Sequence, residues 1–272
     1  MANWIFFKRK KATCAPAFSV VANSSSIIGS RPTQQDYILL PGEDVSLSAL
    51  NKKGYMAVLC DGMGGLEGGE TASRVCANTL MNAYYQREAD DPCDFYRAVL
   101  PEADSVVAKL TDDAGELFRC GTTVTSAIIR NRRLYWASVG DSRVYLLRKG
   151  KLSRLSKDHN HGLALAAQYA AGEISELDML LDKQRNALIS FIGIDGLELM
   201  DISREEQLLD KGDMALLCSD GLYHALRDEE IEETINAYEG RLGLLPEVLT
   251  EMASDRDWIL HDNISVVVLG LQ

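Results

Sequence analysis

Five aspartates, each at one end of a short apolar run, place the tightest constraint on how this chain can fold. Asp61, Asp141 and Asp220 follow such runs, whereas Asp36 and Asp262 precede them. In an antiparallel sheet the end of one strand lies beside the start of its neighbour, so we expect all five carboxylates at a single sheet edge. Carboxylates a few ångströms apart repel one another strongly unless they are protonated or bound to cations. The pattern therefore predicts a cage for hard metal ions.

Length and composition indicate a globular protein with no general affinity for nucleic acid. The chain has 272 residues, of which 46% are hydrophobic and 25% are charged, and this length can bury a substantial core. The net charge of −12 argues against binding to a nucleic acid backbone, which requires basic patches. We expect an N-terminal tail over residues 1–16 and one folded domain over residues 17–272.

The cysteines and the N-terminal segment predict a cytoplasmic protein with no transmembrane segment. The six cysteines show no CxxC spacing, so we interpret them as buried thiols in a reducing compartment. The apolar residues 4–7 precede the basic residues 8–11, which is the reverse of a signal peptide, and the apolar run is too short to cross a bilayer. We expect a disordered or lightly docked tail, with contact to anionic lipid as the weaker alternative.

The periodicity of apolar residues predicts strands in runs and helices in pairs. Residues 61–65 are rich in glycine and predict a turn that leads into a helix, and a polar loop is expected between residues 40 and 55. A second helix is expected near residues 94–110, with its boundary left open at Pro101. Further helices are predicted at residues 229–238 and 246–253. Strands are predicted at residues 17–22, 37–40, 55–60, 121–129, 134–139, 143–147, 151–155, 214–218 and 264–269.

This order of elements predicts an α+β fold in which two antiparallel sheets are covered by helices. Residues 161–192 interrupt the strands with an alanine-rich helical stretch that contains the capping pattern Ser175-x-x-Asp178. An insertion at this place, near the acidic edge, could serve as a lid or recognition flap.

The residue types at the acidic edge indicate which metal ions would bind there and which reaction they could support. Oxygen-only ligands favour Mg²⁺ or Mn²⁺ over zinc. Two such ions about 3.5–4 Å apart can share a water, lower its pKa and aim hydroxide at a phosphorus centre. The glycines after Asp61 would let a backbone carbonyl, that of Gly62, approach a metal. Arg31, five residues before Asp36, could hold a phosphate through paired N–H donors.

The glycine-rich segment and the histidines give weaker predictions of function than the aspartates do. The glycine-rich segment completes neither GxGxxG nor a Walker loop, so it does not predict a nucleotide site. The four histidines lack ligand spacing. His159 or His261 could donate a proton, although a polar loop role is the stronger expectation for each.

Seven short motifs follow one another along the chain. They are Arg31-Pro-Thr-Gln-Gln-Asp36, Asp61-Gly-Met-Gly-Gly65, Gly121-Thr-Thr123, Val139-Gly-Asp-Ser-Arg143, Lys157-Asp-His159, Ser219-Asp-Gly221 and Asp262-Asn263. Taken in order, they resemble the motifs of the metal-dependent protein phosphatases, the type 2C Ser/Thr phosphatase family. The similarity runs from about residue 20 to the C-terminus, and residues 171–175 with Arg185-Asn186 look like the flap region of bacterial-type, single-domain members.

The resemblance implies a four-layer α-β-β-α sandwich with a flap at about residues 161–192 and a binuclear Mg²⁺ or Mn²⁺ centre. By this similarity Asp61 would bridge two metals, Gly62 would give its carbonyl, and Asp220 and Asp262 would complete one metal's shell. Asp36 would bind or orient waters on the other metal. Asp141, with Asp220, would match a weaker third metal site, and Arg31 would match the phosphate-binding arginine.

The function implied is hydrolysis of phosphoserine and phosphothreonine in proteins, with a Ser/Thr kinase as counterpart. Animal members carry His where this chain has Met63, and Met cannot donate a proton. Bacterial-type members share this Met, so the proton would come from a metal-bound water or from His159. Two alternatives remain: a catalytically silent member acting as a regulatory binding module, and a phosphatase for small phosphoesters.

Overall fold

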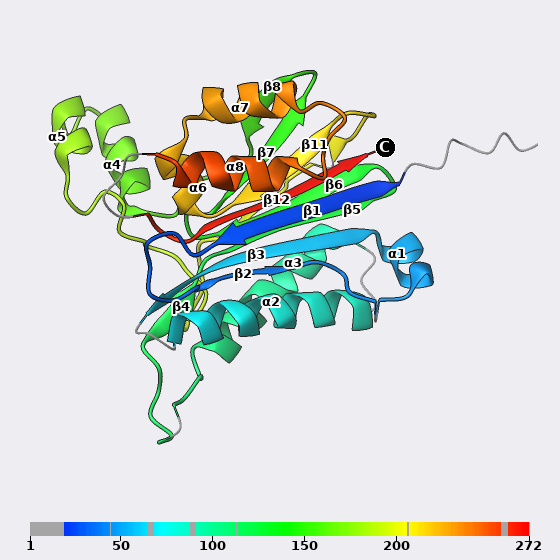
Figure 1. Ribbon diagram of the computed structural model, residues 1–272. Coiled ribbons are helices and arrows are strands. Elements are labelled where there is room, and N and C mark those ends of the chain that lie inside the picture. The colour runs from blue at the N-terminus through cyan, green and yellow to red at the C-terminus, as the bar shows by residue number, and fades with distance from the viewer. Residues whose placement is uncertain are drawn as a thin grey trace, which may run out of the picture.

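Two antiparallel sheets pack face to face, and helices cover both outer faces (Figure 1). The computed structural model describes residues 19–43, 45–64, 68–87, 91–112, 114–205, 207–256 and 261–271. The four-layer α+β sandwich predicted from the sequence is confirmed. The predicted tail lies outside the described residues. No helix in these ranges combines the length and apolar character that crossing a membrane requires.

The first sheet has five strands, and its central strands carry two of the candidate aspartates at their ends. Ile264 begins one of these strands two residues after Asp262, and Cys218 ends its neighbour two residues before Asp220. The register pairs Cys218 with Val266, so these two ends lie side by side. The strand order is β1 (Val20–Ile27), β12 (Ile264–Leu271), β11 (Met214–Cys218), β7 (Arg143–Arg148) and β8 (Lys151–Arg154).

The second sheet brings the other acidic ends to the same side of the molecule. Its long strand β3 (Tyr55–Gly64) pairs with β2 (Asp36–Leu39), with β5 (Val124–Arg130) and, over its last three residues, with β4 (Cys120–Thr122). On the far side of β5 lies β6 (Arg133–Val139). The short strands β9 (Asp201–Ile202) and β10 (Gln207–Leu208) both pair with β6.

Alternating side chains of the strands divide the core into three layers. The layer between the sheets contains Leu59, Trp136, Val144 and Leu217, among others. One outer layer packs against α2 (Gly68–Gln86) and α3 (Pro92–Val107), and the other against α6 (Asp220–Ala225), α7 (Asp228–Ala237) and α8 (Leu245–Ser254). All eight residues of β12 are buried because it is central in its sheet and covered on both faces.

The structure adds a helix where the sequence predicted a loop, and it resolves the boundary of another helix. A helix, α1 (Leu47–Lys53), occupies the predicted polar loop, capped by the Ser46 hydroxyl, which accepts from the Ala49 N–H. None of its residues is buried, so no apolar periodicity marked it. The boundary left open at Pro101 is resolved, because α3 runs through this proline.

Two strand predictions are also corrected. Residues 61–64 do not form a turn, because β3 continues through them and pairs with β4. The strand predicted over residues 121–129 is split at Thr123 into β4 and β5. Thr123 is held to the other strand, since its hydroxyl accepts from the Asp61 N–H and its own N–H donates to the Asp61 carbonyl.

The flap, residues 161–192, lies outside the sandwich and contains α4 (His161–Ala170) and α5 (Glu176–Leu181) (Figure 1). The predicted capping pattern is present as a capping box at the start of α5. The Ser175 hydroxyl accepts from the Asp178 N–H, and the Asp178 carboxylate accepts from the Ser175 N–H.

Candidate active site

All five predicted aspartates lie at one end of the sandwich. Asp36 and Asp61 are direct partners in the β2–β3 ladder. Asp141 follows β6, Asp220 is the first residue of α6 directly beyond β11, and Asp262 precedes β12. Burial raises the pKa of Asp61 well above its usual range, and the charges of the other four aspartates raise it further. The structure therefore brings together the cluster that the sequence predicted.

Asp36 and Asp220 each have a buried carboxylate oxygen that has no hydrogen-bond partner in the described part of the chain. Asp36 is 6% exposed, and its Oδ2 accepts a 2.8 Å hydrogen bond from the Ser219 hydroxyl. Its Oδ1, like Oδ1 of Asp220, finds no hydrogen-bond partner among the described residues. Burial raises the pKa of Asp36 to about 7, with contributions from the charges of Asp220 and Asp262. Leaving a buried acceptor unsatisfied costs about 1–3 kcal/mol, so these oxygens favour a cationic ligand.

Asp141 and Asp220 form the flap side of the cluster. Burial, and then the charge of Asp220, raises the pKa of Asp141 to about 7. Burial also raises the pKa of Asp220, whereas the nearby His224 lowers it. His224 places Nδ1 3.5 Å from Oδ2 of Asp220, one helical turn away on α6. The sequence did not predict this contact because α6 has only six residues, too few to show the apolar periodicity of a helix.

Arg31 reaches the cluster through Asp262. Its Nη2 donates to Oδ2 of Asp262 at 2.5 Å, and this hydrogen bond is the main cause of a raised Arg31 pKa. The Arg31 side chain is 57% exposed, so its remaining N–H groups face solvent. Asp262 is oriented further by the Asn263 N–H, which donates to its Oδ1 at 2.8 Å. The guanidinium therefore lies at the edge of the cluster, where a phosphate could approach.

Two positions at the site require glycine because backbone atoms of neighbouring segments approach them closely. A Cβ atom on Gly62 would lie 2.1 Å from the Gly69 carbonyl oxygen, and one on Gly221 would lie 2.2 Å from that of Asn263. Both distances are far below van der Waals contact, so a side chain would push β3 away from α2 at Gly62, and α6 away from the start of β12 at Gly221. The Asp-Gly pairs that the sequence showed are thus packing requirements at the acidic edge.

The histidines considered as proton donors have structural partners. His159 is 2% exposed, and its Nδ1 accepts from the Gly140 N–H at 3.2 Å. Burial lowers the His159 pKa, which favours the neutral ring. A ring nitrogen of His261 contacts the Arg256 carbonyl oxygen at 2.9 Å. The geometry assigns His159 to the support of the β6–β7 corner that carries Asp141.

The donor set fits hard divalent cations in its chemistry. It consists of carboxylates, two of them with an orphaned buried oxygen, and the backbone at Gly62. Across the parts of the chain that the structure describes, no three His, Cys, Asp or Glu side chains converge as tightly as the ligands of one ion. Two of the carboxylates accept hydrogen bonds from the protein: Asp36 accepts from the Ser219 hydroxyl, and Asp262 accepts from Arg31.

Comparison with known proteins identifies the family. The family model for protein phosphatase 2C matches residues 23–163. The chain belongs to the protein phosphatase 2C family. The resemblance that the motifs predicted is therefore confirmed, and the matched range includes Arg31, Asp36, Asp61 and Asp141.

Serine/threonine phosphatases from several bacteria are similar to this chain in sequence and in fold. The serine/threonine phosphatase stp of Listeria monocytogenes is 29% identical over 188 residues, which cover 67% of this chain and 72% of the relative. The serine/threonine phosphatase of S. agalactiae aligns with a TM-score of 0.78 at 25% identity, covering 93% of this chain and 100% of that one. The catalytic domain of the phosphatase PstP, solved in complex with two manganese ions, aligns with a TM-score of 0.72 at 25% identity, over 94% of this chain and 99% of that one.

Proposed function

We propose that this phosphatase 2C chain hydrolyses phosphoserine and phosphothreonine in proteins with the help of two divalent metal ions. The observation that carries the proposal is the set of aspartates around Asp61, in which two buried carboxylate oxygens have no partner in the described chain. Mg²⁺ and Mn²⁺ match these hard oxygen donors. The two manganese ions in the PstP structure support the same assignment.

The residues that would hold the ions are those that the resemblance to the family assigns. Asp61, Asp220 and Asp262, with the Gly62 carbonyl, would hold the pair, and Asp36 would hold or orient the waters of one ion. Asp141 with Asp220 would provide a third, weaker position. When bound, two such ions lower the pKa of a water and neutralise the charge of a phosphoryl group.

The chain's own groups would then position the substrate. Arg31, with N–H groups free in solvent, would donate paired hydrogen bonds to the phosphate of the substrate. For this it must share or release Asp262, which its Nη2 contacts in the structure. Met63 cannot protonate the leaving hydroxyl, and the burial and hydrogen bonding of His159 argue against that histidine. A water at the acidic cluster is the source that we propose.

A phosphopeptide assay with metal-stripped protein tests the function. We expect Mn²⁺ or Mg²⁺ to restore hydrolysis of a phosphothreonine peptide, and Asp61→Asn and Asp220→Asn to reduce turnover at least a hundredfold in folded protein. Asp255→Asn, an exposed carboxylate at the end of α8, is the matched control and should retain full activity. Near wild-type rates in either cluster variant would refute the metal assignment.

The same assay separates the two alternatives. A catalytically silent binding module would retain phosphopeptide binding without turnover at any metal concentration. A small-molecule phosphatase would turn over phosphorylated metabolites more efficiently than peptides. The intact carboxylate set argues against the first, and the flap beside the cluster, which offers a surface for a polypeptide, argues against the second.

The remaining proposals concern the setting of the protein. We propose a cytoplasmic location, supported by the free, buried thiols of Cys60, Cys76, Cys120 and Cys218. A Ser/Thr kinase would supply the substrates, because the proposed reaction consumes their phosphate groups. We also propose the division into a tail at residues 1–16 and a catalytic domain at residues 17–272, with the flap as its substrate-facing insertion.

A further inference from the structure

A cavity of about 550 Å³ lies beside the acidic cluster, between the flap and α6. Asp141 lines it on the cluster side, and Tyr223 and His224 line it from α6. Leu163 and Met179 line it from the two flap helices. His224, which lines the cavity, places its Nδ1 3.5 Å from Oδ2 of Asp220, so the cavity opens next to the proposed reaction centre.

The charges in this cavity are opposite in sign to those of the protein as a whole. Its lining contains four cationic side chains and two carboxylates, in a chain of net charge −12. One of the carboxylates, Asp158, is already shared by Arg143 at 2.8 Å and Arg154 at 3.1 Å. The Arg143 guanidinium also stacks over the Tyr223 ring, 3.4 Å from its centroid.

The other two cations, Lys157 and Arg185, are available to a ligand. Both side chains are exposed, and neither forms an ion pair with a carboxylate in the described ranges. Lys157 is fixed at its backbone, where its N–H donates to the Asp201 carboxylate at 3.0 Å. Arg185 is fixed in the same way, since its carbonyl accepts from the Gly162 N–H at the start of the flap. Two cations on the wall of one cavity, without a carboxylate partner among the described residues, favour an anionic ligand there.

The apolar part of the lining suits a polypeptide chain better than a free ion. Leu163 and Met179 are half-buried, so they offer contact area without being part of the closed core. A ligand that fits must therefore combine an acidic group with aliphatic or backbone surface. An acidic residue in a peptide has this chemistry.

Resting on the proposed function, we propose that this cavity is a specificity subsite for an acidic side chain near the phosphorylated residue of the substrate. Lys157 and Arg185 bind the acidic group, and the flap leucine and methionine contact the adjoining chain. The recognised chemistry is a carboxylate or a second phosphate. Lys157 and Arg185 lie outside the metal-binding cluster, so their removal should change peptide selection without changing the reaction itself.

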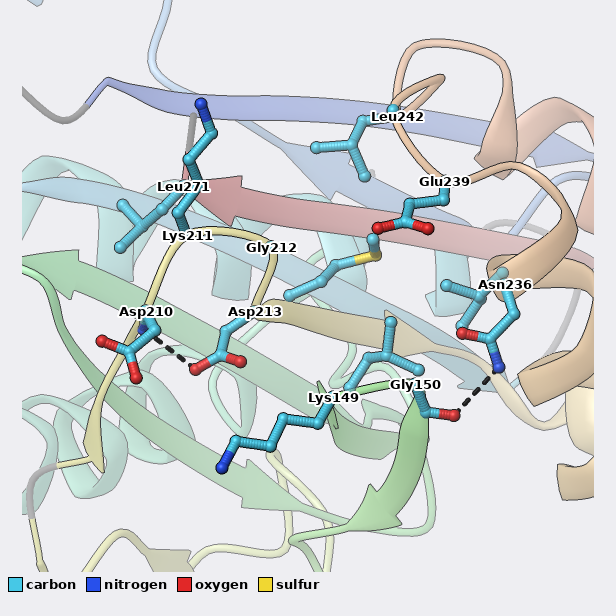
Figure 2. Close-up of a pocket in the computed structure, with 14 residues that line it drawn as sticks. Lys149, Gly150, Asp210, Lys211, Gly212, Asp213, Asn236, Glu239, Leu242 and Leu271 are labelled. Carbon is cyan, nitrogen blue, oxygen red and sulfur yellow. Dashed lines mark hydrogen bonds between the residues drawn. The ribbon is translucent and has the colours of Figure 1, made fainter.

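A second cavity provides the matched control. It has a volume of about 850 Å³ and lies at the opposite end of the five-stranded sheet, next to Met214 and Leu271 (Figure 2). It also carries two exposed lysines, Lys149 and Lys211, which extend away from each other in Figure 2. Lys149→Gln with Lys211→Gln therefore removes the same charge far from the reaction centre.

The experiment measures kcat/KM for phosphothreonine peptides that differ only in the residues flanking the phosphothreonine. The flanking residues are glutamate, alanine, lysine, or a non-hydrolysable phosphonate analogue of phosphoserine, placed on either side. We expect the wild-type protein to favour an acidic flank over alanine by about three- to tenfold, as two exposed charge pairs allow. A preference for glutamate identifies a carboxylate ligand, and one restricted to the phosphonate identifies a second phosphate.

The variants decide whether this cavity is responsible. Lys157→Gln with Arg185→Gln should bring the preference close to one, whereas the control pair should retain it. Hydrolysis of p-nitrophenyl phosphate, which has no peptide chain, should be unchanged in both. Equal rates on acidic and alanine peptides in the wild type, or an undiminished preference in the cavity variant, would overturn the subsite. If the wild type hydrolysed neither peptide nor p-nitrophenyl phosphate with metal present, the proposed function would fail, and the subsite with it.

Discussion

Asp36 and Asp61 stand directly opposite each other in the β2–β3 ladder, at the end of the sandwich where three further aspartates gather. Like charges in this position destabilise a sheet, and here Asp36 is also buried and Asp61 half-buried. The fold tolerates the arrangement because β11 and β12 behind the cluster are buried throughout and the glycines allow close approach. The cluster therefore destabilises the fold locally, and a bound cation would offset this loss of stability.

This relationship predicts how the stability of the metal-free protein depends on pH. Burial raises the folded-state pKa of Asp36 to about 7, whereas the pKa of an unfolded aspartate is about 3.9. The folded state therefore holds the proton more tightly, and the stability that this contributes is present below the unfolded pKa and lost as pH rises through about 7. One pKa unit corresponds to about 1.4 kcal/mol, so the loss is on the order of a few kcal/mol.

Urea unfolding in a chelator between pH 5 and pH 8 measures this effect. We expect the free energy of unfolding to fall with rising pH, and the fall to be smaller in Asp36→Asn. The raised pKa values of Asp61, Asp141 and Asp220 act in the same direction, so the variant keeps part of the slope. Equal slopes in the two proteins would show that Asp36 titrates normally.

Arg31 should contribute to catalysis much more than to stability. Its ion pair with Asp262 is exposed, and such pairs stabilise a fold by at most about 1 kcal/mol. A lost charge-assisted hydrogen bond to a phosphate costs about 1.5–3 kcal/mol, so Arg31→Ala should lower kcat/KM about ten- to a hundredfold. Arg97→Ala is a suitable control, since Arg97 is also 57% exposed and paired with an aspartate. Similar activity losses in both variants would refute a phosphate-binding role for Arg31.

Gly221 should be intolerant of any side chain. Its Cβ would meet the Asn263 carbonyl at 2.2 Å, and overpacking of this kind costs about 1–3 kcal/mol. Gly243→Ala is the control, because a Cβ there meets nothing within 4 Å and its φ is not in the left-handed region. We expect Gly221→Ala to unfold at lower urea concentration and Gly243→Ala to match the wild type. Unchanged stability in Gly221→Ala would mean that the backbone shifts at little cost.

The acidic site was predictable from sequence because strand ends and turn residues leave a local signature. Each candidate aspartate borders an apolar run, and antiparallel pairing brings such ends together whatever the details of the sheets. Elements without an apolar face left no such signature. The exposed helix α1 has no buried residue, and α6 is a six-residue helix that begins with an Asp-Gly pair, which is typical of a turn.

Tertiary contacts account for what the sequence could not show. The pairing of β3 with β4 turns a glycine-rich segment into a strand, although its composition is typical of a turn. The position of His224 beside Asp220 depends on α6, so the unpredicted helix also concealed this contact. The cationic cavity joins residues from β7, the segment after β8, the flap and α6, which only the folded chain brings together.

His159 should affect the stability of the protein and not its reaction. Its effect on stability should depend on pH in the opposite direction to that of Asp36. Burial lowers its folded-state pKa, and its Nδ1 must stay unprotonated to accept from the Gly140 N–H. As pH falls below the unfolded value of about 6.5, the unfolded chain takes up a proton that the folded state resists, so stability is lost towards acid pH. In His159→Asn, whose side-chain oxygen can replace the acceptor, this contribution to acid sensitivity should disappear.

The difference in unfolding free energy between wild type and His159→Asn isolates the effect, because the aspartates titrate in both proteins. We expect the wild type to lose stability relative to the variant as pH decreases from 7.5 to 5.5, in about the range where an unfolded histidine takes up its proton. We also expect kcat on a phosphothreonine peptide to stay within about twofold, because the histidine supports the Asp141 corner and transfers no proton. A kcat reduced by orders of magnitude, in a variant of unchanged stability, would instead identify His159 as the proton donor.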